Sequence, residues 1–101
     1  MTKRVDSNGV ETNEFGGKQS HLDTCYTCIP FNAIERVAKT LEYGRVKYNK
    51  DNWRLIPLED HLEHALRHVF AYLGGETTNE DDLAHAATRL LFALELDKDK
   101  E

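Results

Sequence analysis

Histidines cluster in one part of this chain, at a spacing that a helix would bring onto one face. His61, His64 and His68 stand at positions i, i+3 and i+7, and side chains at these positions lie one above another on a helix. Further along, Asp82 and His85 are again one helical turn apart. Because neutral imidazoles and carboxylates are donors that divalent cations take in proteins, we expect a shared metal or phosphate site. Its predicted metal ligands are His64, His68, Asp82 and His85.

The segment that carries Asp82 also has an apolar face. Asp82, His85 and Arg89 follow one border of a stripe at i, i+3 and i+7, and the stripe consists of Leu83, Ala86, Ala87, Leu90, Leu91 and Leu94. Small alanines beside this polar line favour a site reached from a cleft. The simpler alternative is a surface helix whose acidic N-terminus faces the helix dipole, with His85 merely exposed.

Basic and aromatic residues form a second candidate set, suited to a nucleotide. Lys18 follows two glycines, Arg67 stands between two of the histidines, and Lys47 and Tyr48 precede a polar turn. An aromatic ring beside amide and cationic groups can stack a base and hold phosphates. The predicted nucleotide-binding residues are Lys18, Lys47, Tyr48, Asn52, Trp53 and Arg67. A solvated basic turn around a core tryptophan, and an ion pair between Arg67 and Glu63, are the structural alternatives.

Three helices would position these residues. Apolar residues at helical spacing predict helices from about residue 30 to 43, from Pro57 to Leu73 and from about residue 81 to 96. Gly44 weakens or ends the first helix, although its pattern continues to Tyr48. A short loop after Gly74 makes the last two helices an antiparallel pair. We predict an all-α fold without strands: the last two helices form the centre, the first covers them, and oligomerisation completes the small bundle.

Composition and charge bound the functional class. The chain has 101 residues, of which 40% are hydrophobic and 31% charged, and its net charge is −5; one small globular domain fits these values. The acidic balance argues against a nucleic acid polymer as partner. No apolar run approaches the ~20 residues that span a bilayer, and the first residues do not resemble a signal peptide. We therefore expect a cytoplasmic protein without a membrane partner.

The ends of the chain differ from its centre. Residues 1–29 lack periodicity and are predicted to form a flexible N-terminal arm; residues 30–97 form the all-α domain, and residues 98–101 a charged tail. The arm contains Cys25 and Cys28, with His21 four residues before the first. A structural zinc site would need a second ligand pair. We expect two reduced thiols in a tight turn, with zinc or redox chemistry as the alternative.

Several short motifs occur in a distinctive order between Gly16 and Leu96. They are Gly16-Gly17-Lys18, Ile29-Pro30, Ala33 to Ala38, Tyr43-Gly44, Lys47-Tyr48, Asn52-Trp53, Leu66-Arg67-His68, Gly75-Glu76, Leu83-Ala84-His85-Ala86 and Leu91-Phe92. In order and spacing they resemble the phage-rich dATP/dGTP diphosphohydrolase family. That family is similar to the MazG-like all-α nucleotide pyrophosphatases, which use a divalent metal and work as oligomers.

The resemblance implies metal-dependent hydrolysis of purine deoxynucleoside triphosphates to monophosphate and pyrophosphate. It implies Mg²⁺ or Mn²⁺ as cofactor, a homo-oligomer, a purine nucleotide or nucleotide-derived signal as partner, and the host cytoplasm as location if a phage encodes the chain. Glu35 matches an acidic position of the family and is the predicted catalytic residue, as a further metal ligand or to orient water.

The match to the MazG-like pattern is partial. Asp82-x-x-His85 stands where those enzymes place Glu-x-x-Asp, and His64 and His68 stand on the helix where they place Glu-x-x-Glu. Two explanations compete. The site uses a metal that accepts histidine, such as manganese, cobalt or zinc; or the protein binds without cutting, as a phage sponge that sequesters a nucleotide immune signal.

Overall fold

Three helices and a small sheet make up the part of the chain that the computed structural model describes, residues 4–76 and 80–97. The helices are α1 (Phe31–Tyr48), α2 (Leu58–Leu73) and α3 (Asp82–Leu96), and a short 3-10 turn, η2 (Asn52–Leu55), joins the first two. The predicted tail, residues 98–101, lies outside the described residues.

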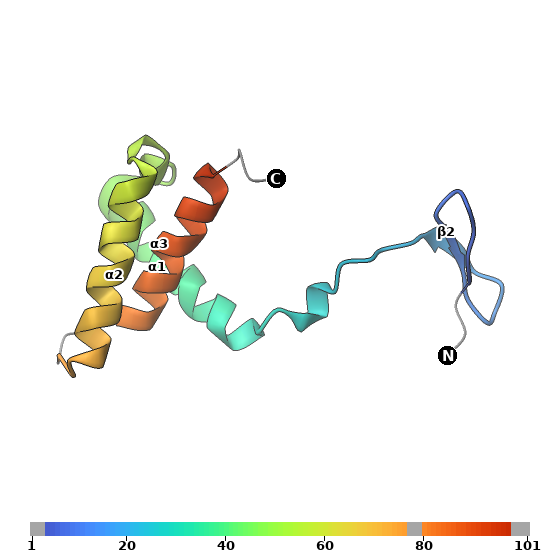
Figure 1. Ribbon diagram of the computed structural model, residues 1–101, viewed down its shortest axis with the longest axis horizontal. Helices are drawn as coiled ribbons and strands as arrows, with labels where there is room; N and C mark the ends of the chain where they lie inside the picture. The colour runs from blue at the N-terminus through green and yellow to red at the C-terminus, as the bar shows by residue number, and fades with distance from the viewer. Residues whose placement is uncertain (1–3, 77–79, 98–101) are drawn as a thin grey trace.

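The helices pack as a bundle in which α2 and α3 run antiparallel along each other, and α1 packs mainly against α3 (Figure 1). Small side chains fill the interior: the buried apolar residues of the bundle are Val37, Ala65, Ala71, Ala84, Ala86 and Ala93. Alanines let helix backbones approach closely, and several larger leucines of the helices, such as Leu66, Leu73 and Leu94, stay exposed. The three predicted helices and the antiparallel pairing are confirmed.

Helix α1 extends past Gly44, the residue at which the sequence predicted that it would weaken or end. Gly44 lies inside α1, which continues to Tyr48 and ends where Asn49 adopts a left-handed φ of 109°. A glycine inside a helix costs about 1 kcal/mol relative to alanine, which is not enough to end this one. A β-carbon at Gly44 would meet nothing within 4 Å, so this residue leaves open space beside the helix.

The N-terminal segment contains strands, which corrects the all-α prediction. Strands β1 (Arg4–Val5), β2 (Val10–Thr12) and β3 (Lys18–Ser20) form an antiparallel sheet in the order β1-β2-β3. Glu11 is paired with Gln19 across the β2–β3 register and is the one buried residue of the sheet. Strands of two or three residues are too short to show the alternation that identifies a strand in a sequence.

Two turns of the same construction hold this sheet. Asp6 Oδ1 accepts hydrogen bonds from the amides of Asn8 and Val10, each at 2.9 Å, and Asn13 Oδ1 accepts from two amides in the second turn in the same way. Each turn contains a glycine in the left-handed region, which is Gly9 in the first turn and Gly16 in the second. Such turns, in which an Asp or Asn side chain caps its own loop, are sequence signals for hairpins.

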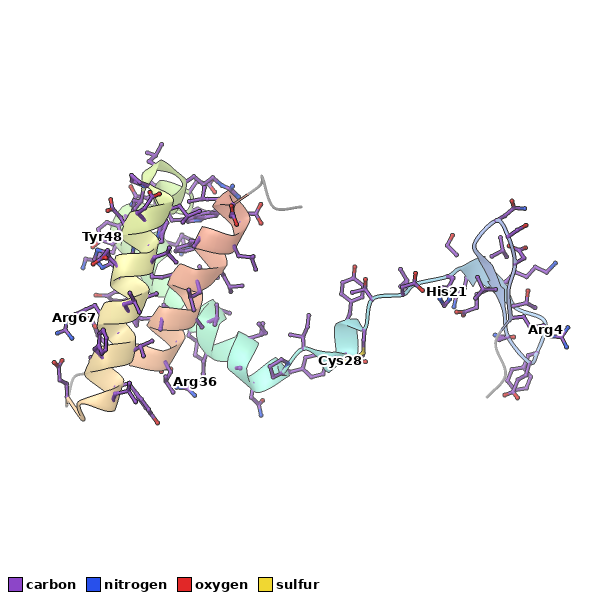
Figure 2. All side chains as sticks on the ribbon, in the orientation of Figure 1. Arg4, His21, Cys28, Arg36, Tyr48 and Arg67 are labelled. Atoms are coloured by element: carbon purple, nitrogen blue, oxygen red, sulfur yellow. A yellow bond between two sulfur atoms is a disulfide. The ribbon has the colours of Figure 1, made fainter. Side chains whose placement is uncertain are left out.

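A linker of residues 21–30 connects the sheet to the bundle and holds the two apart, so that the molecule is 55 Å long and at most 29 Å wide (Figure 1). The linker contains the 3-10 turn η1 (Tyr26–Cys28), across which Cys25 and Cys28 form a disulfide (Figure 2). The expectation of two reduced thiols is therefore wrong. Within the described residues, none of the helices combines the length and apolar character that crossing a membrane requires.

Candidate functional site

A cleft of about 470 Å³ lies between the C-terminal half of α1, the η2 turn and the facing sides of α2 and α3. Its volume falls within the ~300–1,000 Å³ typical of small-molecule sites. Helix α3 contributes His85, Arg89 and Phe92 at i, i+4 and i+7, so one face of this helix forms a wall. Gly44 lines the opposite wall, where its missing side chain leaves room.

Carboxylates and an imidazole meet where α2 ends and α3 begins. His68 Nδ1 lies 2.9 Å from Asp82 Oδ1 and 3.9 Å from Glu80 Oε2, and the three donor groups can all be placed within 4.8 Å of one another. Asp82 is 9% exposed and stands in the first turn of α3, where the helix dipole favours a negative charge. We call these three residues the donor cluster.

Two further histidines line the cleft, and one of them, His85, borders the donor cluster. The His85 ring stacks on the His68 ring, with centroids 4.8 Å apart and planes 25° apart. Burial, followed by the charge of His68, lowers the pKa of His85. Burial, followed by the charge of Arg89, lowers the pKa of His64. Both rings therefore favour the neutral form, which is the form that can ligate a metal.

The donor cluster offers one imidazole and two carboxylates, which are groups that divalent cations take in proteins. In the structure His68 Nδ1 and Asp82 Oδ1 form a hydrogen bond at 2.9 Å, so a cation bound by both atoms would take the place of the hydrogen between them. The structure thus brings two of the four predicted ligands into one donor set and adds Glu80 to them. His85 lies against this set, whereas His64 lines the cleft outside it.

A second polar group lies deeper, between the helices. His61 is 0% exposed, its Nε2 lies 3.0 Å from the Trp53 carbonyl oxygen, and its Nδ1 lies 3.1 Å from Arg89 Nη1. A carbonyl only accepts and a guanidinium only donates. His61 is therefore neutral, with its hydrogen on Nε2, and Nδ1 accepts a hydrogen bond from Arg89.

The aromatic residues predicted to stack a base differ in accessibility. One face of the Trp53 ring stacks on Phe92, with centroids 4.4 Å apart and planes 6° apart, and Arg54 covers the other face with Cζ 4.3 Å from the centroid. A base could stack on Trp53 only by displacing Arg54. Tyr48 lines the cleft and is 56% exposed, with Lys47 Nζ 5.0 Å from its ring centroid.

Four of the predicted nucleotide-binding residues line the cleft: Lys47, Tyr48, Asn52 and Trp53. The structure does not bring Lys18, Glu35 or Arg67 to it. Lys18 lies on β3 in the separate sheet, and Glu35 is exposed on α1. Arg67 points to solvent and pairs with Glu76 at 3.2 Å (Figure 2).

The bundle defines a small helical domain with a cleft that Lys47 and Arg89 line and with the donor cluster at one end of it. A protein-family model described as dATP/dGTP diphosphohydrolase, N-terminal, matches residues 13–101, and the chain belongs to this family. The matched segment contains β3 and all three helices, while β1 and β2 precede it. Comparisons with curated proteins and with solved structures return no match.

Proposed function

We propose that the cleft binds a purine deoxynucleoside triphosphate and hydrolyses it to the monophosphate and pyrophosphate in a reaction that depends on a divalent metal. The observation that carries this proposal is the donor cluster at one end of a cleft whose other walls carry Lys47, Arg89 and an accessible tyrosine. The family description supplies the substrate class. We group the chain with the MazG-like pyrophosphatases, although histidines stand at positions where those enzymes place acidic residues.

His68, Glu80 and Asp82 would hold the cation, which when bound would polarise a phosphate oxygen and favour ionisation of a coordinated water. The protein's own groups prepare this chemistry. His85 restrains the His68 ring by stacking on it, and the first turn of α3 holds Asp82 beside His68. In this proposal Glu80 takes the acidic role predicted for Glu35, because Glu80 lines the cleft and Glu35 does not.

Phosphate charge would be balanced by cations from two helices. Lys47 is on α1 and Arg89 on α3, and both line the cleft. A hydrogen bond with Tyr48, followed by the electrostatic effect of the Tyr43 hydroxyl, raises the pKa of Lys47, and a lysine is charged at neutral pH in any case. Stabilisation of charge that develops on phosphate oxygens is the main protein contribution to phosphoryl transfer.

The exposed apolar surface supports a homo-oligomer. The chain exposes 8466 Å², against about 5,800 Å² expected for a compact chain of 11.6 kDa. The extended linker accounts for part of the excess. An apolar groove between α1 and α3 accounts for another part, and its exposed members include Ile34, Leu83, Leu90, Leu91 and Leu94. A standard interface covers about 800 Å² per partner, so we propose that copies of the chain associate through this groove.

The experiment is product analysis with matched variants. Purified protein is incubated with dATP or dGTP in Mg²⁺, Mn²⁺ or EDTA, and the products are separated by anion exchange. We expect monophosphate and pyrophosphate only with metal. Glu80→Gln should abolish turnover, while Glu59→Gln, which neutralises an exposed acid in the first turn of α2, should leave turnover unchanged. Equal turnover in both variants would contradict the role of the donor cluster.

One observation favours a non-catalytic alternative. The donor cluster offers two carboxylates and one imidazole, fewer oxygens than a site for several Mg²⁺ ions would use. A protein of this kind would retain its nucleotide in EDTA and release it unchanged when denatured. Recovery of intact ligand from wild-type protein in every metal would replace the hydrolase proposal with sequestration of a nucleotide signal.

A further inference from the structure

We propose that Arg89 is the phosphate anchor of the cleft: its guanidinium binds a ligand phosphate without any metal, and buried His61 holds it in position. The inference rests on the proposed function only in taking a phosphate-bearing ligand as the occupant of the cleft. Arg89 is not among the residues that spacing alone selected for phosphate contact, and the charge and contacts of the folded chain single it out.

The charge environment of Arg89 differs from that of the other bundle arginines. Each of those forms an ion pair with a carboxylate; the pairs are Arg36–Asp81, Arg45–Glu42, Arg54–Asp51 and Arg67–Glu76. Among the described residues, the hydrogen-bond partner of Arg89 is the neutral His61 ring. The cleft therefore contains a guanidinium whose charge the described part of the protein does not neutralise.

Because the Arg89 guanidinium is partly buried, its positive charge would favour binding of an anion in the cleft. Arg89 is half-buried and lines the cleft, and burial lowers the pKa of its guanidinium, although an arginine stays protonated in proteins. A cation removed from water without a counter-charge is destabilised. An oxyanion entering the cleft would supply that counter-charge. Guanidinium groups bind phosphate through paired N–H donors, and His61 uses one of the donors that Arg89 offers.

The hydrogen-bond chain behind Arg89 limits its movement. The Trp53 carbonyl of η2 accepts from His61 on α2, and His61 accepts from Arg89 on α3. Three elements thus fix one guanidinium, so less side-chain freedom is lost when phosphate binds. We therefore assign His61 as a positioning residue, since at 0% exposure it does not itself reach the ligand.

Position along α3 indicates which ligand suits the site. Arg89 follows Asp82 by seven residues, which is about 10 Å along a helix axis. The anchor and the donor cluster would thus contact different parts of one extended ligand. A polyphosphate chain fits this arrangement, with phosphate oxygens available at both places.

The test uses inorganic tripolyphosphate in EDTA, so that neither a base nor a metal contributes. Calorimetry on the full chain should show binding to wild type and about ten- to a hundredfold weaker binding to Arg89→Met, the range for a lost charged hydrogen bond. Arg89→Lys keeps the charge and should recover part of the affinity. Arg4→Met removes an exposed arginine from β1 and should bind as wild type does.

A second measurement needs no variant. In ¹⁵N spectra of the wild-type chain, saturating tripolyphosphate should shift the Arg89 Nε resonance, and the His61 nitrogens should show the Nε2-protonated tautomer. Unchanged affinity in folded Arg89→Met, an absent Arg89 shift, or no tripolyphosphate binding by wild type would each overturn the anchor. Tripolyphosphate binding through Arg89 without dNTP turnover would support the anchor and refute the proposed hydrolysis. Turnover that is undiminished in Arg89→Met would support the hydrolysis and refute the anchor.

Discussion

Removing the cap of α3 should destabilise the bundle by an amount that the structure allows us to estimate. Asp81 is the N-cap of α3: its Oδ1 accepts from the Ala84 amide at 3.3 Å, and both its oxygens bond Arg36 of α1, with Nε to Oδ2 at 2.8 Å. Loss of an N-cap side chain costs about 1 kcal/mol. The ion pair adds little because both side chains are more than one-third exposed. For a domain of this size, 1 kcal/mol lowers the melting temperature by roughly 4–8 °C.

Two substitutions separate the cap from the ion pair. Asp81→Ala removes both and should show the full fall in thermal melts followed by circular dichroism at neutral pH. Asp81→Asn keeps a capping oxygen and loses the charge, so it should show less than half of that fall. The hydrogen bond to Arg36 holds the pKa of Asp81 below its ordinary 3.8. The stabilisation that the Arg36–Asp81 ion pair contributes is therefore present above pH 3.8. It is lost as the pH falls through the lowered pKa of Asp81. Equal falls in the two variants, or none in Asp81→Ala, would refute this reasoning.

Three further predictions follow from particular contacts. Tyr48→Ala should weaken dGTP binding by roughly 5- to 150-fold if the ring stacks the base and should weaken tripolyphosphate binding much less, because only the hydrogen bond to Lys47 is lost there; equal losses in calorimetry would exclude stacking. The hydrogen bond to Glu11 raises the pKa of His21 above 6.5. The hydrogen bond between His21 and Glu11 should therefore stabilise the sheet in full below pH 6.5, and this stabilisation should be lost as the pH rises through the raised pKa of His21. A midpoint at or below 6.5 in an NMR titration of His21 would contradict this prediction. Leu94→Glu, in the α1–α3 groove, should shift light-scattering mass toward the monomer, and a wild-type monomer would refute association.

The helices could be predicted because their apolar residues recur over many turns, so single exceptions such as Gly44 do not hide the period. The sheet could not, because its strands have two or three residues and are defined by side chains that cap turns. Asp6 and Asn13, each followed by a left-handed glycine, were the available signal. The disulfide likewise depends on how the η1 turn places Cys25 and Cys28.

The site was partly predictable for a similar reason. Helical spacing places His68 and Asp82 on faces that meet once α2 and α3 pair. Spacing alone cannot decide which arginine faces the cleft: Arg67 and Arg89 both stand near histidines, yet one pairs with Glu76 at the surface and the other with buried His61. Glu80 lies in a loop where no periodicity exists, and its proximity to His68 arises only when the chain turns between the two helices.

The most direct test of the central claim compares wild type with Asp82→Asn, which keeps the shape of this residue and removes its charge. Each protein is incubated with dATP and dGTP in Mn²⁺ and in EDTA, and pyrophosphate release is measured. We predict that wild type releases pyrophosphate in Mn²⁺ and none in EDTA, and that Asp82→Asn loses most or all of this activity. Release that persists in EDTA and in Asp82→Asn would contradict a metal site at the donor cluster, and intact triphosphate in every wild-type reaction would contradict hydrolysis.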